Sequence, residues 1–169
     1  MPNQNLRHAL IHRKAKFIDQ FVDKFKGFRR RSNFPHKEAG TIIHFLFPHS
    51  NYSGRGAFKT AHKISSRSRD LVLKTSQPKN IANDLKAYKR IPVNLRNRYF
   101  AKIYWRTKYC LLQKHGRKSP VPDEKLKKLK LVAKKHGLTD VRLDNIRKID
   151  GHFKIIDANV SVRRKIKRN

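Results

Sequence analysis

Electrostatic repulsion is the strongest constraint on how this chain can fold. Its 169 residues contain 43 lysines and arginines but only 11 aspartates and glutamates, which gives a formal net charge of +32. Ordinary soluble domains carry far smaller net charges, and self-repulsion on this scale opposes a compact state unless salt or a polyanion relieves it. The composition therefore favours contact with RNA, a ribosome or another anionic surface over a solvated lysine-rich surface.

Length and cysteine content limit the class of protein further. The chain is long enough for one domain, or for one domain with an arm, and 37% hydrophobic residues allow only a small core. Its single cysteine, Cys110, excludes a disulfide framework or a four-cysteine zinc site within one chain. No apolar run approaches the roughly 20 residues that span a bilayer. The N-terminus lacks the apolar core of a secretory signal, so we expect a cytoplasmic protein.

The N-terminal part, residues 1–40, is predicted to be a basic helix followed by a linker. Residues 5–28 have apolar side chains at helical spacing, and residues 29–40 are basic and irregular. The apolar stripe either packs on the domain core or makes the helix a basic amphipathic arm for RNA or membrane. Its aromatic members are Phe17, Phe21, Phe25 and Phe28.

The remaining pattern predicts an α+β fold. Turn-forming residues occupy 49–56, and residues 162–169 form a basic tail beyond the main domain at 41–161. The predicted strands are residues 41–47, 58–64 and 71–73, with a hairpin formed by 99–104 and 109–112. The predicted helices are residues 78–91 and 124–136.

Acidic and amide side chains near the C-terminal end form a pattern with chemical meaning. Asp140 and Asn145 have the spacing D-x-x-x-x-N, and Asp157 follows at the end of an apolar stretch. Asp150 and Gly151 are a strong turn signal between two short strands, so a hairpin returns Asp157 to the neighbourhood of Asn145. A carboxylate and an amide oxygen that face one cleft can hold Mg²⁺, which prefers hard oxygen ligands.

This passage resembles the catalytic and metal-binding loops of the protein-kinase-like superfamily. The resemblance implies that Asp140 is the catalytic base, and that Asn145 and Asp157 hold Mg²⁺ against the phosphates of ATP. Each residue also has an ordinary structural interpretation: Asp140 and Asn145 can serve a turn, and Asp157 can pair with a nearby lysine.

The upstream half of the chain resembles the same superfamily. Gly54 and Gly56 match its glycine-rich loop, in which glycine lets backbone N–H groups approach phosphate oxygens. Lys74, after the strand 71–73, matches the lysine that contacts the α- and β-phosphates. Residues around Leu112 match the segment whose backbone meets the adenine ring. The resemblance therefore implies a kinase-like N-lobe.

Several positions depart from the family pattern. Leu138 replaces the usual histidine, Asp84 is the best substitute for the missing glutamate partner of the lysine, and the D-F-G element reads Asp157, Ala158, Asn159. Asn159 can adopt the left-handed backbone that glycine provides, at some cost. Only twelve residues follow Asp157, so we expect a much reduced C-lobe, which a protein partner can complete.

Two functions remain open at this point. The first is a minimal ATP-dependent phosphotransferase that uses the residues named above. The second is a catalytically weak or inactive kinase-like protein that acts as a basic RNA- or ribosome-binding module. The net charge of +32 favours the second function, and the retained polar residues favour the first.

Overall fold

The computed structural model describes residues 4–29, 34–55, 59–64 and 71–160, and its fold is α+β, as the sequence predicts. The chain divides into two compact units. Unit 1 comprises Met1–Ala82 and Lys102–His115, and unit 2 comprises Asn83–Ala101 and Gly116–Asn169. The N-terminal 40 residues therefore belong to unit 1 rather than to a separate part, and the tail at 162–169 lies outside the described residues. In the described helices, no stretch is long and apolar enough to cross a membrane.

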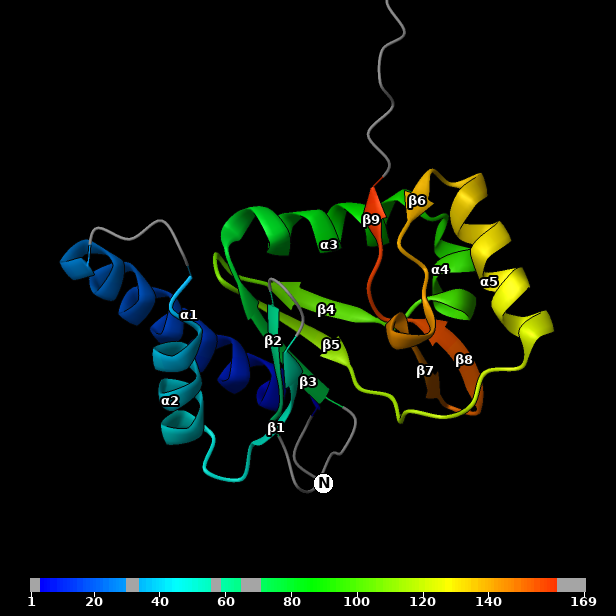
Figure 1. Cartoon of the computed structure of the whole chain (residues 1–169). Coiled ribbons are helices and arrows are strands. Elements are labelled where there is room, and N and C mark those ends of the chain that lie inside the picture. The colour runs from blue at the N-terminus through cyan, green and yellow to red at the C-terminus, as the bar shows by residue number, and fades with distance from the viewer. Residues whose placement is uncertain (1–3, 30–33, 56–58, 65–70, 161–169) are drawn as a thin grey trace, which may run out of the picture. The chain divides into compact units, whose positions relative to one another are not determined.

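Unit 1 is built on a five-stranded antiparallel sheet with the strand order β1-β2-β3-β5-β4 (Figure 1). All six residues of β3 are buried, including the polar Lys74, Thr75 and Ser76, and the strand is flanked by β2 and β5. The hairpin predicted around residues 99–112 is present as β4 and β5. The strand bounds are β1 Asn51–Arg55, β2 Lys59–Lys63, β3 Leu71–Ser76, β4 Ile103–Arg106 and β5 Cys110–Lys114.

The helix α1 (Gln4–Arg29) packs its apolar side on this sheet. The buried face confirms the predicted stripe at Ile18 and Val22, which the sequence groups with the phenylalanines, but Phe17 is 49% exposed and Phe21 is only partly buried. Aliphatic residues at the helical spacing of three and four do most of the packing, because they share one side of the helix. These buried residues are Ile11, Ala15, Ile18 and Val22.

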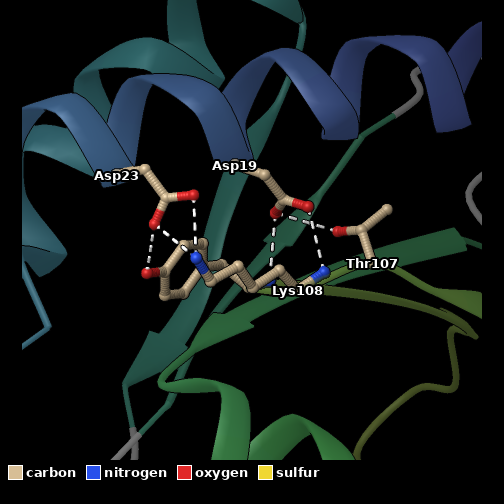
Figure 2. Close-up of polar contacts among 5 residues, drawn as sticks. Asp19, Asp23, Thr107 and Lys108 are labelled. Atoms are coloured by element: carbon tan, nitrogen blue, oxygen red, sulfur yellow. Dashed lines mark hydrogen bonds and ion pairs between the residues drawn. The ribbon is translucent and has the colours of Figure 1, made fainter.

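Two carboxylates of α1 hold the turn between β4 and β5 (Figure 2). Asp19 accepts hydrogen bonds from the backbone N–H groups of Lys108 and Tyr109 at 2.9 and 3.0 Å, and from the Thr107 hydroxyl at 3.0 Å. Asp23 accepts from Lys108 Nζ at 2.7 Å and from the Tyr109 hydroxyl at 2.6 Å. Burial alone would raise the pKa of Asp23, but these two donors outweigh it and hold the pKa below its ordinary value.

Residues 41–47 were predicted as a strand, and residues 29–40 as a linker; both predictions are wrong where the structure forms the helix α2 (His36–Leu46). Ala39 and Ile43 are fully buried, and Ile42 and Leu46 pack against the same core. These positions share one face only in a helix, so burial of that face outweighs the β-propensity of the Ile-Ile-His-Phe run.

Unit 2 contains the rest of the helices and two short antiparallel strand pairs (Figure 1). The predicted turn at Asp150 and Gly151 is confirmed, with φ angles of 50° and 79° that suit a two-residue hairpin turn. Tyr99, predicted to begin the strand 99–104, ends the helix α4 instead. The elements are α4 Val93–Tyr99, α5 Asp123–Lys135, β6 Leu138–Thr139, β7 Ile146–Ile149, β8 His152–Ile155 and β9 Asn159–Val160, while α3 (Pro78–Arg90) enters unit 2 from unit 1.

The first prediction distinguishes the helix α2 from a strand. Ile43 and Phe45 would share a face in a strand, but in the helix Ile43 is fully buried and Phe45 is 76% exposed. We expect Ile43→Ala to lower the free energy of unfolding by about 2–5 kcal/mol, because it opens a cavity in the core. Phe45→Ala should change it by less than about 0.5 kcal/mol in the same urea titration. Equal losses in the two variants would contradict the helix.

The second prediction concerns His62, which is only 2% exposed on β2. The rings of His44 and Tyr52 lie 5.5 and 5.7 Å from its ring centroid, and within the described residues neither ring nitrogen has a hydrogen-bond partner. Burial, followed by repulsion from His44, lowers the pKa of His62 from 6.5 to about 4. The unfolded chain therefore takes up a proton at a higher pH than the folded chain does.

The contribution of neutral His62 to the free energy of unfolding should be fully present above pH 6.5. It should decline as the pH falls toward the pKa of the folded state. We expect a loss of about 3 kcal/mol in the free energy of unfolding by pH 4, measured by urea titrations at a series of pH values. His62→Gln should flatten this dependence, whereas substitution of the exposed His152 by Gln should leave it unchanged. An identical pH profile for wild type and His62→Gln would refute this account.

Candidate functional site

The candidate site of unit 2 begins with a tight loop from Asp140 to Asn145. Asp140 follows β6 with a φ of 65°, a conformation that is uncommon for residues other than glycine and is enriched at functional sites. The Asn145 side-chain Nδ2 donates to the Asp140 carbonyl at 2.8 Å, and the Asn145 backbone N–H donates to the Arg142 carbonyl at 2.9 Å. The two ends of the D-x-x-x-x-N pattern are therefore tied directly together.

The segment that contains Asp157 is attached to this loop on both sides. On one side, the Ile156 N–H donates to the Asn145 carbonyl at 2.8 Å. On the other, β9 pairs with β6 so that Asn159 faces Thr139, and Asn159 Nδ2 lies 3.4 Å from Asp140 Oδ2. The half-buried Asp157 thus lies between two points of attachment to the loop.

Arg142 is a charged member of the site that the sequence pattern did not single out. Its Nε lies 2.7 Å from Asp140 Oδ1, and its side chain is 73% exposed. An exposed ion pair of this kind contributes little stability, so the guanidinium can exchange the carboxylate for another anion at small cost. In a chain with 43 basic residues, one arginine two positions after an aspartate carries no distinguishing signal.

The candidate Mg²⁺ ligands of this site are side-chain oxygens of Asn145 and Asp157. Because Asn145 Nδ2 is bonded to the Asp140 carbonyl, its Oδ1 is the atom left for a cation. Across the described ranges, no group of three or more His, Cys, Asp and Glu side chains could hold a metal ion. The sequence resemblance assigns Mg²⁺ to Asn145 and Asp157, and Mg²⁺ commonly takes its other ligands from phosphate and water.

Unit 1 carries the other residues predicted from the sequence. Gly54 lies in β1 at an irregularity of the β1–β2 pairing, and its φ of 147° requires glycine. No described atom lies within 4 Å of the position that a Cβ would take there. Gly56 lies outside the described residues. Lys74 lies in β3 opposite Ala61 and Leu111 and is 6% exposed.

Leu112 lies in the middle of the sheet rather than at its end. It faces Leu73 in β3 and Trp105 in β4, and its side chain is fully buried in the core of unit 1. In a strand flanked on both sides, most backbone N–H and C=O groups bond to the neighbouring strands, so few are left to bond an adenine ring.

The left-handed backbone anticipated at Asn159 is absent. Among the described residues other than glycine, only Asp140 and Asp150 have positive φ angles. Asn159 is extended in β9, and its side chain accepts from Asn83 Nδ2 at 3.1 Å. Pairing with β6 fixes this residue, so the segment after Asp157 continues as a strand.

No protein-family model matches the chain, and no curated protein has a significant match to it. The assignment of the site therefore rests on the geometry of its own residues.

The third prediction tests the bond that closes the loop. Asn145→Asp keeps the shape of the side chain but places an oxygen against the Asp140 carbonyl, where a donor is required. We expect a loss of about 1–3 kcal/mol in the stability of unit 2, seen as faster hydrogen exchange in peptides that cover residues 138–160. Asp144→Asn is the matched control, because Asp144 is 86% exposed and its removal should leave exchange unchanged. Unchanged exchange in both variants would rule out this role for Asn145.

Proposed function

We propose that the chain is a minimal ATP-dependent phosphotransferase of the protein-kinase-like superfamily, with ATP and Mg²⁺ as cofactors. The observation that carries this proposal is the meeting of three segments in unit 2. Asn145 is bonded to Asp140 through its side chain and to the segment of Asp157 through its backbone carbonyl. These bonds place the D-x-x-x-x-N loop beside the segment of Asp157, which supports the proposal because phosphoryl transfer depends on positioning.

In this proposal each polar residue of unit 2 has one task. Asp140 orients the acceptor hydroxyl and accepts its proton, with Arg142 beside it to neutralise charge on the transferred phosphoryl group. Asn145 and Asp157 hold Mg²⁺, which neutralises the phosphate oxygens when it is bound. The positive φ of Asp140 supports a positioned carboxylate, because such a conformation persists only where surrounding contacts enforce it.

We assign the residues that bind the phosphates of the nucleotide to unit 1. The glycines at 54 and 56 allow close approach of backbone N–H groups, and Lys74 supplies a positive charge on β3. The five-stranded antiparallel sheet, with a glycine-containing β1 and a lysine on β3, is compatible with a kinase-like N-lobe. The reduced helical part then makes unit 2 a small C-lobe, which a protein partner can complete.

The fourth prediction tests nucleotide binding directly. We expect calorimetric titration of ATP with Mg²⁺, in moderate salt, to show saturable binding that Asp157→Ala abolishes. Asp144→Ala is the matched control, since it removes an exposed carboxylate from the same loop and should bind as wild type does. Salt suppresses the nonspecific attraction between a chain of +32 and any triphosphate.

Asp140→Asn should bind the nucleotide but transfer no phosphoryl group. Equal weak binding in wild type and Asp157→Ala, erased by salt, would sink the proposal.

A second candidate is a kinase-like module that binds RNA or a ribosome without catalysis. The net charge of +32 is the observation that favours it, because charge of this size attracts polyanions. The two functions are compatible, since a basic surface can deliver a phosphotransferase to a nucleic-acid-rich target. Salt-insensitive binding to RNA, or none at low salt, would count against this module.

A further inference from the structure

The helix α5 (Asp123–Lys135), the yellow helix of Figure 1, is rich in exposed lysines. Its acidic residues, Asp123 and Glu124, lie in the first turn, where the helix dipole favours them. The remaining polar residues of the helix are lysines, and all of them are exposed. They are Lys125, Lys127, Lys128, Lys130, Lys134 and Lys135.

These lysines form two rows on the face opposite the core. Leu129 and Ala133 are buried and define the inner face of α5. At 3.6 residues per turn, Lys127, Lys130 and Lys134 lie within about 60° of one another and make the first row, which is about 10 Å long. Lys128 and Lys135, seven residues apart, make the second row, and the 68%-exposed Leu131 lies between the rows.

The charge of this face is only partly offset within the helix, where Asp123 and Glu124 lie four residues before Lys127 and Lys128. None of the six lysines makes an ion pair or a hydrogen bond with another described residue. The neighbours Lys127 and Lys130, and Lys130 and Lys134, repel one another at the i,i+3 and i,i+4 spacings, each by a few tenths of a kcal/mol. A polyanion that binds along the two rows would relieve this repulsion and release its own counterions.

We propose that the outer face of α5 docks on the phosphate backbone of an RNA duplex. The face has lysines, which contact phosphates as point charges, but no aromatic side chain on which an unpaired base could stack. Lysine is the one side chain on this face that could read guanine edges in the major groove of DNA, since the helix has no arginine, asparagine or glutamine. Double-stranded RNA is recognised mainly through its shape and backbone, which such a face suits.

A membrane surface is the less suitable partner for this face. An interfacial helix buries a broad apolar side among lipid chains, but the apolar side of α5 is already used in the core of unit 2. Leu131 alone remains on the outer face. The inference goes beyond the proposed function by naming a partner for unit 2, and it holds independently of nucleotide binding.

The experiment measures binding of the full chain to a labelled RNA duplex by fluorescence anisotropy over a range of KCl concentrations. The test variant replaces Lys127, Lys130 and Lys134 by Gln. The matched control replaces the exposed Arg13, Lys16 and Lys24 of α1 by Gln, so both variants lose the same charge. The α5 variant should bind at least about tenfold more weakly, and the slope of log K against log salt should fall by about two to three. The α1 variant should bind within about threefold of wild type.

Three outcomes would overturn the inference. Equal weakening by the α5 and α1 variants would mean that net charge alone attracts the RNA. Tighter binding to a DNA duplex or to single-stranded RNA than to the RNA duplex would exclude the proposed partner. Binding to phosphatidylserine vesicles that Leu131→Ser abolishes, with RNA binding unaffected by the lysine substitutions, would make the face a membrane site.

A parallel ATP titration of the α5 variant separates this inference from the proposed function. If the α5 variant keeps Mg²⁺-dependent ATP binding but loses RNA duplex binding, the result supports both the docking face and the phosphotransferase. Duplex binding that depends on α5, in a wild-type chain without saturable ATP binding, supports the docking face and rejects the phosphotransferase alone.

Discussion

Asn145 holds the candidate site together from two directions. Its side-chain amide closes the loop by donating to the Asp140 carbonyl, and its backbone carbonyl accepts from Ile156, next to Asp157. The hairpin of β7 and β8 makes the second bond possible, because a two-residue turn returns the chain to its starting point. Without these bonds, the left-handed backbone of Asp140 would have little to enforce it, and Asp157 would lose its fixed place beside the loop.

Four of the 11 acidic residues lie where the fold or the candidate site uses them. Asp19 and Asp23 fasten α1 to the turn between β4 and β5, which accounts for the attachment of a strongly basic helix to the sheet. Asp140 and Asp157 belong to the candidate site. On α5, Asp123 and Glu124 face six lysines, and none of these lysines is held in an ion pair by a described residue.

Local sequence signals predicted those parts of the fold in which local and tertiary preferences agree. The strands at β2 and β3, the hairpin turn at Asp150 and Gly151, and the helices α3 and α5 have strong signals within a few residues. The helix α2 could not be predicted this way, because its β-branched run becomes helical only through burial of Ala39 and Ile43. Arg142 was hidden by the abundance of basic residues, and the interior position of Leu112 depends on pairing with two strands.

The central claim is that the loop of Asp140 and Asn145 receives a nucleotide. Hydrogen exchange of the full chain, with and without ATP and Mg²⁺ in moderate salt, tests it most directly because it reports where the nucleotide acts. The account predicts increased protection in peptides that cover residues 140–157, with no change over α5. Protection confined to the lysine-rich helices, with residues 140–157 unchanged, would show that ATP is attracted by charge alone and would contradict the account.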